Sequence, residues 1–322
     1  TIGIGSGCAS SASITMPGRG PIMVDVLALL FFPGGLALLL FGLTFTWLDR
    51  KLLARLQNRL GPRWFQLPAD VLKLLAKEEV IPAGVNRLLF TTLPIIALAG
   101  ALTAALYVPL WGLAPSFSFR GDLIVTIYLL SLLTLCTGLA GANNQGEFSL
   151  LGAVRALTQL FAYEAPFLLA LIGPALVAGS WQIDEIVGYA TDHWLILTQP
   201  IGFLVALIGL MGKLEMPPFD APEAETEIVT GALTEYSGRG LALFQLGRGV
   251  ELVIGLALIV TFYLGGIGHP LLFLAKNLLL ILLMAVGQSL MTRLRIDQTV
   301  GLWWRYGALL ALGQWLLLIW LA

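Results

Sequence analysis

The chain has 322 residues, of which 58% are hydrophobic and only 11% are charged, and its formal net charge is −1 at pH 7. Soluble proteins use about 45–50% apolar and about 25% charged residues, so this chain lacks the charged surface that a soluble core requires. The near-neutral charge excludes a basic nucleic-acid surface, and two cysteines and two histidines exclude a disulfide framework, a structural zinc site and an iron–sulfur cluster held by this chain alone. The mean hydropathy of +0.89 therefore predicts an all-α, polytopic membrane protein.

About eight stretches of the sequence are predicted to cross the membrane as helices. They follow residues 1–22, which are mostly small and polar, lack the basic and apolar regions of a signal peptide, and are expected to form an exterior tail. Residues 23–322 are expected to form a single membrane domain. A bilayer core requires about 20 apolar residues per helix, so the expected spans run near residues 24–47, 89–111, 122–142, 153–178, 196–214, 240–264, 270–291 and 302–321.

Basic residues are concentrated on one side of these predicted spans. The segments after odd-numbered spans hold Arg50, Lys51, Arg55, Arg59, Arg63, Lys73, Lys77, Arg87, Arg155, Lys213, Arg239, Arg293 and Arg295, whereas the opposite loops hold Arg120 and several carboxylates. Cytoplasmic loops carry the excess of Lys and Arg in membrane proteins. We therefore expect the basic segments to be cytoplasmic, both termini to lie outside, and the protein to reside in the inner (plasma) membrane of a cell.

The segment 48–88, here called the docking loop, has a more regular pattern than a linker requires. A basic residue recurs every four positions from Lys51 to Arg59, opposite leucines, which predicts an amphipathic helix that ends at Gly61. Pro68 is expected to be the first residue of a second short helix. Two interpretations are open: the helices lie in the lipid headgroup layer, or they form a platform on which a peripheral subunit docks.

The segment 213–239, here called the acidic loop, carries a dense group of carboxylates, namely Glu215, Asp220, Glu223, Glu225, Glu227 and Glu235. If the middle of the loop is helical, Glu223 and Glu227 share one face and Glu225 points away from it. A solvated acidic loop is one interpretation. A protein-walled cavity is the other, because apolar residues alternate with the acids and three prolines fix the backbone. Crowded, partly buried carboxylates have raised and coupled pKa values, which suits proton uptake.

Three ionisable residues, Glu164, Glu251 and Lys276, lie inside predicted spans. An unpaired charge within the bilayer costs several kcal/mol, so such residues face the interior of the helix bundle and are functional by default. Arg248 precedes Glu251 on the same helix face, so a structural ion pair between them is the alternative there. Glu164 lies shortly before Pro166, whose missing N–H frees a backbone carbonyl and makes a polar position within the helix.

Four sequence blocks, taken in order, resemble the H subunit of respiratory complex I. The first block runs from Asp49 to Pro62 and continues with Gln66, Asp70 and Lys73; the second runs from Phe148 to Arg155 and continues to Glu164; the third runs from Phe219 to Val229 and continues with Glu235, Tyr236 and Ser237; the fourth runs from Arg295 to Gln298. The resemblance covers roughly residues 24–321.

The resemblance implies a membrane subunit of a proton-translocating NADH–quinone oxidoreductase that holds no redox centre of its own. In that family, FMN and iron–sulfur clusters belong to peripheral-arm subunits, and antiporter-like and small membrane subunits continue the membrane arm. The family member forms the membrane side of a quinone chamber, and an acidic funnel below the chamber couples quinone reduction to ion pumping. No nucleic-acid partner is expected.

The resemblance also assigns roles to individual residues. The quinone chamber and the docking loop would use Arg50, Arg59, Gln66, Asp70 and Lys73. Proton coupling would use Arg155, Glu164, Glu215, Asp220, Glu223, Glu225, Glu227, Glu235 and Glu251. No catalytic residue and no metal-binding residue is expected in this chain.

Two other functions stay open. Only Arg63, Trp64 and Phe65 separate Pro62 from Gln66, where complex I members usually have a longer stretch. The short loop is expected of the homologous membrane subunit in energy-converting nickel–iron hydrogenases, which use the same platform without a quinone. A stand-alone secondary transporter is the third interpretation, and it would require inverted repeats and broken helices in both halves of the sequence, neither of which is visible.

Overall fold

The protein is all-α, as the sequence predicts. A computed structural model describes residues 30–31, 34–266 and 268–321, so the predicted tail 1–22 and the start of the first predicted span lie outside the described residues. The helices are α2 (Gly35–Leu56), α3 (Gln66–Ala76), α4 (Arg87–Ala104), α5 (Asp122–Asn143), α6 (Glu147–Ala178), α7 (Ile183–Asp192), α8 (Leu195–Thr198), α9 (Pro200–Lys213), η1 (Ala221–Glu223), α10 (Glu225–Ile228), η2 (Gly231–Leu233), α11 (Gly238–Tyr263), α12 (Pro270–Leu290), α13 (Ile296–Leu302), η3 (Trp303–Gly307) and α14 (Ala308–Leu321). No strand of a sheet occurs among these described residues.

Six helical segments of the described chain are long and apolar enough to cross a membrane. They are α4, α5, α6, α11, α12 and the continuous segment Ile296–Trp320, which joins α13, η3 and α14. The apolar helix α9 is shorter, with 14 residues. The protein is therefore a multi-pass membrane protein, and the expected number of eight spans stays a prediction.

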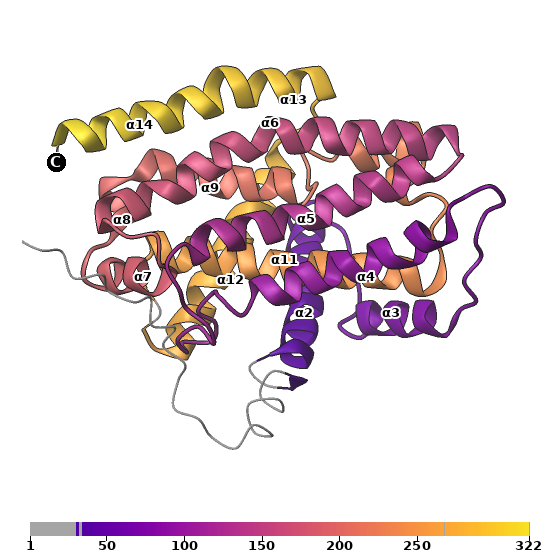
Figure 1. The fold of residues 1–322 in the computed structure, drawn as a ribbon, viewed down its shortest axis with the longest axis horizontal. Helices are drawn as coiled ribbons and strands as arrows, with labels where there is room; N and C mark the ends of the chain where they lie inside the picture. The colour runs from indigo at the N-terminus through magenta and orange to yellow at the C-terminus, as the bar shows by residue number, and fades with distance from the viewer. Residues whose placement is uncertain (1–29, 32–33, 267, 322) are drawn as a thin grey trace, which may run out of the picture.

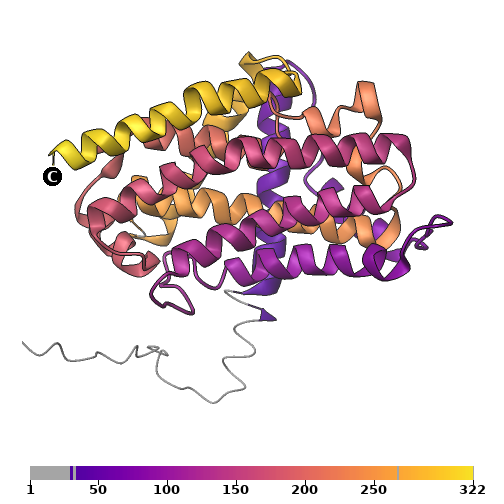
Figure 2. The same ribbon diagram turned by 45° about the horizontal axis from the view of Figure 1, so that its top comes forward.

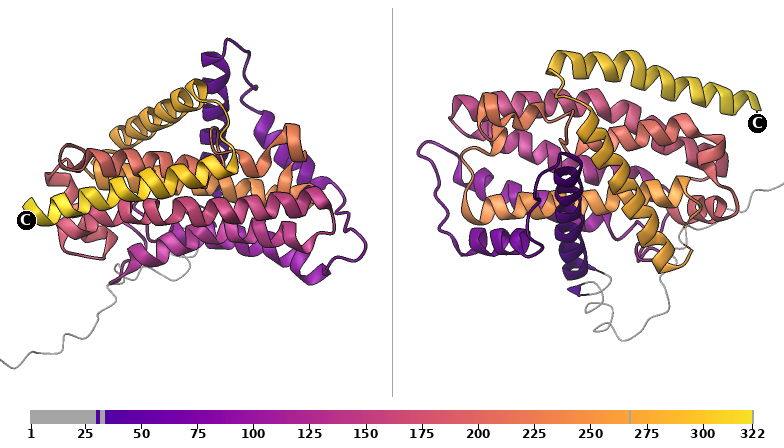
Figure 3. Two further views of the ribbon diagram at one scale, coloured as in Figure 1. Left: turned by 90° about the horizontal axis from the view of Figure 1, so that it is seen from above. Right: turned by 180° about the vertical axis from the view of Figure 1, so that it is seen from behind.

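Helix α11 lies at the centre of the bundle. Its most apolar window is 78% buried, compared with 33% for α12 and 28% for the last segment. Helices α4 and α5 lie on one face of α11, and α2 and α12 cross its other face (Figures 1 and 3). Helix α14 runs along α6 at the edge of the bundle (Figure 2). The carboxylate of Glu251, in the middle of α11, is consequently enclosed by other helices rather than by lipid.

The basic part of the docking loop is the end of α2 rather than a separate helix. The sequence predicts an amphipathic helix up to Gly61, but α2 continues without interruption from Gly35 to Leu56. No proline interrupts the backbone hydrogen bonds over this range. The chain then leaves the helix through Asn58, which has a positive φ of 56°. The basic side chains therefore project from the rigid end of a long helix.

The second docking-loop helix, α3, begins earlier than predicted. Gln66 is its first residue and Pro68 its third, so the expectation that Pro68 occupies the first position is wrong. The first turn of a helix contains N–H groups without intrahelical partners, so a proline is tolerated at the third position as well. Leu67 and Val71 are the buried residues of α3.

The predicted span 196–214 is broken near its start. Gln199 has non-helical dihedral angles (φ −130°, ψ 53°) and separates α8 from α9. Pro200 explains the break, because the residue before a proline is disfavoured in the helical conformation. Helix α9 ends at Lys213. At 1.5 Å per residue it is only about 21 Å long, so the acidic loop begins deep within the bundle.

Helices α2 and α11 cross at a pair of glycines, Gly42 and Gly249. A Cβ atom placed on Gly42 would lie 2.7 Å from the carbonyl carbon of Gly249, and one on Gly249 would lie 3.1 Å from that of Gly42. The two backbones therefore touch directly. This contact fixes the position of the neighbouring Arg248 on α11.

Replacing either glycine at the crossing should push the two helices apart. We expect Gly249→Ala to destabilise the purified protein by about 1–3 kcal/mol, which is the usual cost of overpacking a close contact. Gly313→Ala on α14 is the matched control, because nothing lies within 4 Å of a Cβ atom there. Thermal unfolding in detergent should show a lower midpoint for Gly249→Ala only, and equal midpoints for the two variants would contradict the prediction.

Candidate functional site

The innermost ion pair joins Lys213, the last residue of α9, to Glu251 in the middle of α11. Lys213 Nζ lies 3.5 Å from Glu251 Oε1, and both side chains are 1% exposed. Lys213 Nζ also lies 3.5 Å from the Ser131 hydroxyl on α5. That hydroxyl donates to Glu164 Oε1 on α6. Four helices therefore meet at one charged group of side chains, Ser131, Glu164, Lys213 and Glu251, which we call the inner cluster.

Arg248, one turn before Glu251 on α11, bridges two carboxylates of the acidic loop. Its guanidinium lies 2.7 Å from Glu215 Oε2 and also contacts Glu223. Arg248 therefore pairs with the loop rather than with Glu251, because its planar fork of donors can bind two carboxylates at once. Burial raises the pKa of Glu215 to about 7, although the neighbouring Arg248 charge lowers it.

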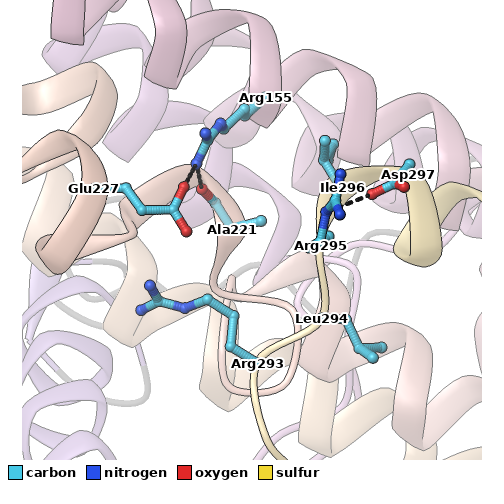
Figure 4. A pocket seen from close by; sticks show the side chains of 8 residues that line it. All are labelled: Arg155, Ala221, Glu227, Arg293, Leu294, Arg295, Ile296 and Asp297. Atoms are coloured by element: carbon cyan, nitrogen blue, oxygen red, sulfur yellow. Dashed lines mark hydrogen bonds and ion pairs between the residues drawn. The ribbon is translucent and has the colours of Figure 1, made fainter.

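Two additional ion pairs, both closer to water, join the acidic loop to its surroundings. Arg155 Nη1 on α6 lies 2.7 Å from Glu227 Oε2. Arg293, between α12 and α13, lies 2.6 Å from Asp220 Oδ2. Both arginines, together with Arg295, line an open cavity of about 330 Å³ (Figure 4). We call these two ion pairs and this cavity the rim.

The ion pairs become more buried from the rim towards the inner cluster. The exposed fractions of the two side chains are 27% and 51% in the Arg155–Glu227 pair, 22% and 5% in the Arg248–Glu215 pair, and 1% and 1% in the Lys213–Glu251 pair. Screening by water falls in the same order, so charges interact more strongly towards the interior. The site therefore contains both water-exposed acids and one fully buried carboxylate, Glu251.

Neighbouring helices and segments donate hydrogen bonds to carbonyl oxygens of the acidic loop and of Gly212 just before it. The Gln159 side chain on α6 donates to the carbonyl oxygens of Gly212 and Phe219, at 2.9 and 2.7 Å. The backbone N–H of Leu294 donates to the carbonyl of Pro218 at 3.0 Å. Several apolar residues of the loop are buried, among them Phe219 and Ile228. The loop is consequently packed into protein, which supports the cavity interpretation over a solvated loop.

The prediction that Glu223 and Glu227 share one helix face is wrong. Glu223 ends η1, Ala224 is non-helical (φ −49°, ψ 87°), and α10 starts after it. Glu223 contacts Arg248 on α11, whereas Glu227 contacts Arg155 on α6. Each carboxylate is paired with an arginine on a different helix, and a single continuous helix would not direct both side chains to these partners.

The residues assigned to the docking loop lie at the surface and take no part in the ion pairs of the acidic loop that the structure describes. The side chains of Arg50, Arg59, Gln66, Asp70 and Lys73 are all exposed. Arg59 contacts Gln57, its near neighbour in sequence. Within the described residues, none of the five forms an ion pair with the acidic loop.

Two further predicted residues, Glu235 and Lys276, form no ion pair with another described residue of the site. Glu235 is half-buried beside Gly146, where a Cβ atom would lie 2.8 Å from Glu235 Oε1. Lys276 donates to the carbonyl oxygens of Gly265 and Gly266, at 3.4 and 3.5 Å, in the turn after α11. The side chain of Glu225 is not among the described parts of the chain.

Sequence reasoning misses three polar residues that the structure places at or near the site. From the sequence, Lys213 is only a basic residue that sets orientation, and Ser131 is only part of a span. Asp49 is 6% exposed and accepts a hydrogen bond of 2.9 Å from Gln288. One signal is available for Lys213, because it directly follows an apolar run and precedes the first acid of the loop.

Comparison with known proteins places the chain in a family. Residues 28–319 match the family described as NADH dehydrogenase. The chain belongs to this family. It is 33% identical over 304 residues to the H subunit of the NADH-quinone oxidoreductase of Carboxydothermus hydrogenoformans, a match that covers 89% of this chain and 87% of the relative. It is 37% identical over 299 residues to the protein of the same name from Anoxybacillus flavithermus, covering 86% and 89%.

A solved structure shows the same fold. It is a chain of the membrane-bound sulfane sulfur reductase, described as an archaeal respiratory membrane complex. The TM-score is 0.76 at 23% sequence identity, and the match covers 91% of this chain and 96% of that chain. The NADH dehydrogenase family member described here thus shares its helical arrangement with a distant relative.

Glu215→Gln should reduce the dependence of stability on pH. Burial raises the Glu215 pKa from 4.5 to about 7, so the folded protein keeps a proton that the unfolded chain releases. Stability conferred by this proton is present below pH 4.5 and is lost as the pH rises to about 7. The thermal unfolding midpoint should therefore fall over this range, and it should fall less steeply in Glu215→Gln.

Glu227→Gln is the control for this titration, because it removes an exposed carboxylate of the same loop. Its unfolding midpoint should follow the same pH slope as the parent protein. Equal slopes for the parent and Glu215→Gln would contradict the assignment of the titration to Glu215.

Proposed function

We propose that this chain is the membrane subunit of a proton-translocating NADH–quinone oxidoreductase. The observation that carries the proposal is a set of ion pairs of increasing burial, from the exposed Arg155–Glu227 pair through the two carboxylates on Arg248 to the buried Lys213–Glu251 pair. Proton translocation requires ionisable groups that enter the membrane between protein walls, and such groups are otherwise avoided there because they are costly. The relatives are named as subunits of NADH-quinone oxidoreductases, which supports electron transfer from NADH to quinone as the reaction of the complex.

In this proposal, the docking loop forms the membrane side of a quinone chamber. Arg50, Arg59, Gln66, Asp70 and Lys73 are exposed on α2, α3 and the loop between them, where they are accessible to a peripheral subunit. Quinone is the substrate at that interface. FMN and iron–sulfur clusters belong to peripheral-arm partners, and antiporter-like and small membrane subunits are the other partners.

The acidic loop couples the chamber to the membrane interior. We assign it to the cytoplasmic side, with both termini of the chain outside, because the basic residues gather there. Reduction of quinone changes the protonation of the loop, and the Glu215 carboxyl, whose pKa is about 7, exchanges its proton near neutral pH. Asp220, Glu223 and Glu227 are paired with three different arginines, so a change in one pair alters the charge that the others experience. The translocase activity is therefore a property of the whole complex to which this chain contributes.

A hydrogenase-type complex is the second candidate function. The observation that favours it is the short connection between Pro62 and Gln66, which leaves little chain to enclose a quinone headgroup. In that case the acidic loop and the inner cluster keep their roles and the quinone chamber is absent.

Purification of the chain with its partners distinguishes the two candidates. Membranes are extracted in mild detergent, the complex is captured through this chain, and NADH–quinone turnover and hydrogen evolution are both assayed. We expect NADH–quinone turnover with a flavin-containing partner. Hydrogen evolution with nickel in the preparation would assign the chain to the hydrogenase-type complex instead.

Glu164→Gln should separate a coupling role from a structural one. We expect the complex to assemble while proton pumping falls by at least about tenfold, because a proton-transferring side chain commonly contributes 10²-fold or more. Pumping is measured as acidification inside inverted membrane vesicles during NADH oxidation. Asp184→Asn, which alters an exposed acid on α7 remote from the site, should pump normally. Normal pumping by an assembled Glu164→Gln complex would remove Glu164 from the pathway.

A further inference from the structure

Lys213 is a buried cation to which the proposed function gives no role. Its side chain is 1% exposed, it ends α9, and its ammonium lies in the inner cluster near side chains from α5 and α11. Lysine is almost never fully buried unless it is paired, because desolvation of the charge is costly. The surroundings of its ammonium therefore indicate what it does.

The distances from the Lys213 ammonium to its acceptors are longer than those in a hydrogen-bonded ion pair. Its Nζ is 3.5 Å from Glu251 Oε1, whereas the Arg248–Glu215 and Arg155–Glu227 pairs have distances of 2.7 Å. Charge-assisted N–H···O bonds are normally about 2.7–2.9 Å long. Within the described residues, neither Glu251 oxygen has a hydrogen-bond partner. The ammonium is thus near Glu251 without being bound firmly to it.

A second acceptor lies at the same distance from the ammonium. Lys213 Nζ is 3.5 Å from Ser131 Oγ, and Ser131 donates to Glu164. The ammonium therefore has one carboxylate nearby on α11, and the Ser131 hydroxyl links it to a second carboxylate on α6. The long, unbranched lysine side chain can turn towards either of them without any movement of the backbone.

The backbone around Lys213 is fixed, which confines any movement to the side chain. Gln159 holds the carbonyl oxygen of the preceding residue, Gly212, at 2.9 Å. The ring of Tyr163 lies below the ammonium, with its centroid 5.6 Å from Nζ. Neither group supplies an anion that would hold Lys213 in one place.

The inner cluster has one more acid than it has cations. With both carboxylates ionised, Glu164, Glu251 and Lys213 carry a net charge of −1. Arg248 on the next turn of α11 is bound by Glu215 and Glu223 and does not form an ion pair with Glu251 in the described chain. A buried excess charge is unfavourable, and one added proton removes it.

We propose that Lys213 is a shared counter-ion that alternates between Glu251 and the Ser131–Glu164 pair, so that a proton in the inner cluster resides on the carboxylate that Lys213 leaves. This inference rests on the proposed function and names its proton-carrying site. A hydronium ion gives a proton to a Glu251 oxygen: an O–H bond of hydronium breaks, an O–H bond forms on the carboxyl group, a neutral water molecule is released, and the cluster becomes neutral. The ammonium keeps its own protons and turns to Ser131 and Glu164. Loss of the proton from Glu251 reverses the movement.

The position of Lys213 connects this alternation to the acidic loop. Lys213 is followed closely by Glu215, which binds Arg248 one turn from Glu251. A charge change at Glu215 therefore alters the field at Glu251 through Arg248. The same electric field acts on the ammonium of Lys213, whose alternative partner is the Ser131–Glu164 pair.

Structures of the intact complex with single substitutions test the inference without any activity measurement. In Glu251→Gln, the ammonium should move to within about 2.7–2.9 Å of a Glu164 oxygen, because only one carboxylate remains. In Glu164→Gln, it should close to the same distance from Glu251. An ammonium that remains in its present position in either variant overturns the inference, and either structure suffices if the other variant fails to assemble.

Pumping by paired substitutions distinguishes a shared counter-ion from a structural ion pair. Lys213→Met leaves the fully buried Glu251 and the partly buried Glu164 without their cation, so the complex should assemble poorly. Lys213→Met combined with Glu251→Gln removes one charge of each sign and should restore assembly. If Lys213 is shared, proton pumping should stay at least about tenfold below the parent in this assembled double variant.

A return of full pumping in the double variant would mean that the pair is structural and would overturn the inference. If the parent complex itself does not pump protons, the proposed function fails, and the displacement of the ammonium in the two structures still decides whether Lys213 is shared.

Discussion

A charge buried at membrane depth must be neutralised by a partner, and the arrangement of this protein follows from that requirement. Lys213 and Glu251 are each 1% exposed, so removing either would leave the other uncompensated in a medium of low polarity. Apolar packing is not directional and tolerates small rotations of a helix. An ion pair requires particular atoms to meet. The inner cluster therefore requires side chains from α5, α6, α9 and α11 to meet at one place in the bundle.

The same requirement explains how irregular backbone is tolerated within the bundle. Unsatisfied peptide groups cost several kcal/mol each in lipid, so non-helical segments at that depth must be enclosed by protein. The acidic loop meets this condition because Gln159 and the backbone of Leu294 bind its carbonyl oxygens, and Phe219 is buried against neighbouring helices. The short α9 makes room for the loop, since a full-length helix would fill the space in which Glu215 and Arg248 meet.

The sequence is sufficient to predict what depends on local pattern, and it fails where distant segments meet. Apolar length locates the helices, and the density of acids locates the loop. The partners of those acids are not predictable, because Arg155, Arg248 and Arg293 come from three separate segments and the choice among them is made by packing. Periodicity places Glu223 and Glu227 on one face, but the break at Ala224 directs them to different helices. Lys213 looks like an ordinary basic residue at a helix end, since burial is a property of the neighbours and not of the residue.

The gradient of burial determines where a chemical event at the surface can influence the membrane interior. Charges in the Arg155–Glu227 pair are partly screened by water, whereas those beside Glu251 are not. Two unit charges about 4 Å apart interact by about 4 kcal/mol at an effective dielectric constant of about 20. Moving one charge across a potential of about 100 mV requires about 2.3 kcal/mol. The energy change when a single buried pair rearranges is therefore large enough to drive a proton against a membrane potential. The energy change is too small when the pair is exposed to water, because water screens its charges. Arg248 has the decisive position, because it is the one arginine that binds the loop while standing one turn from the buried carboxylate among the described residues.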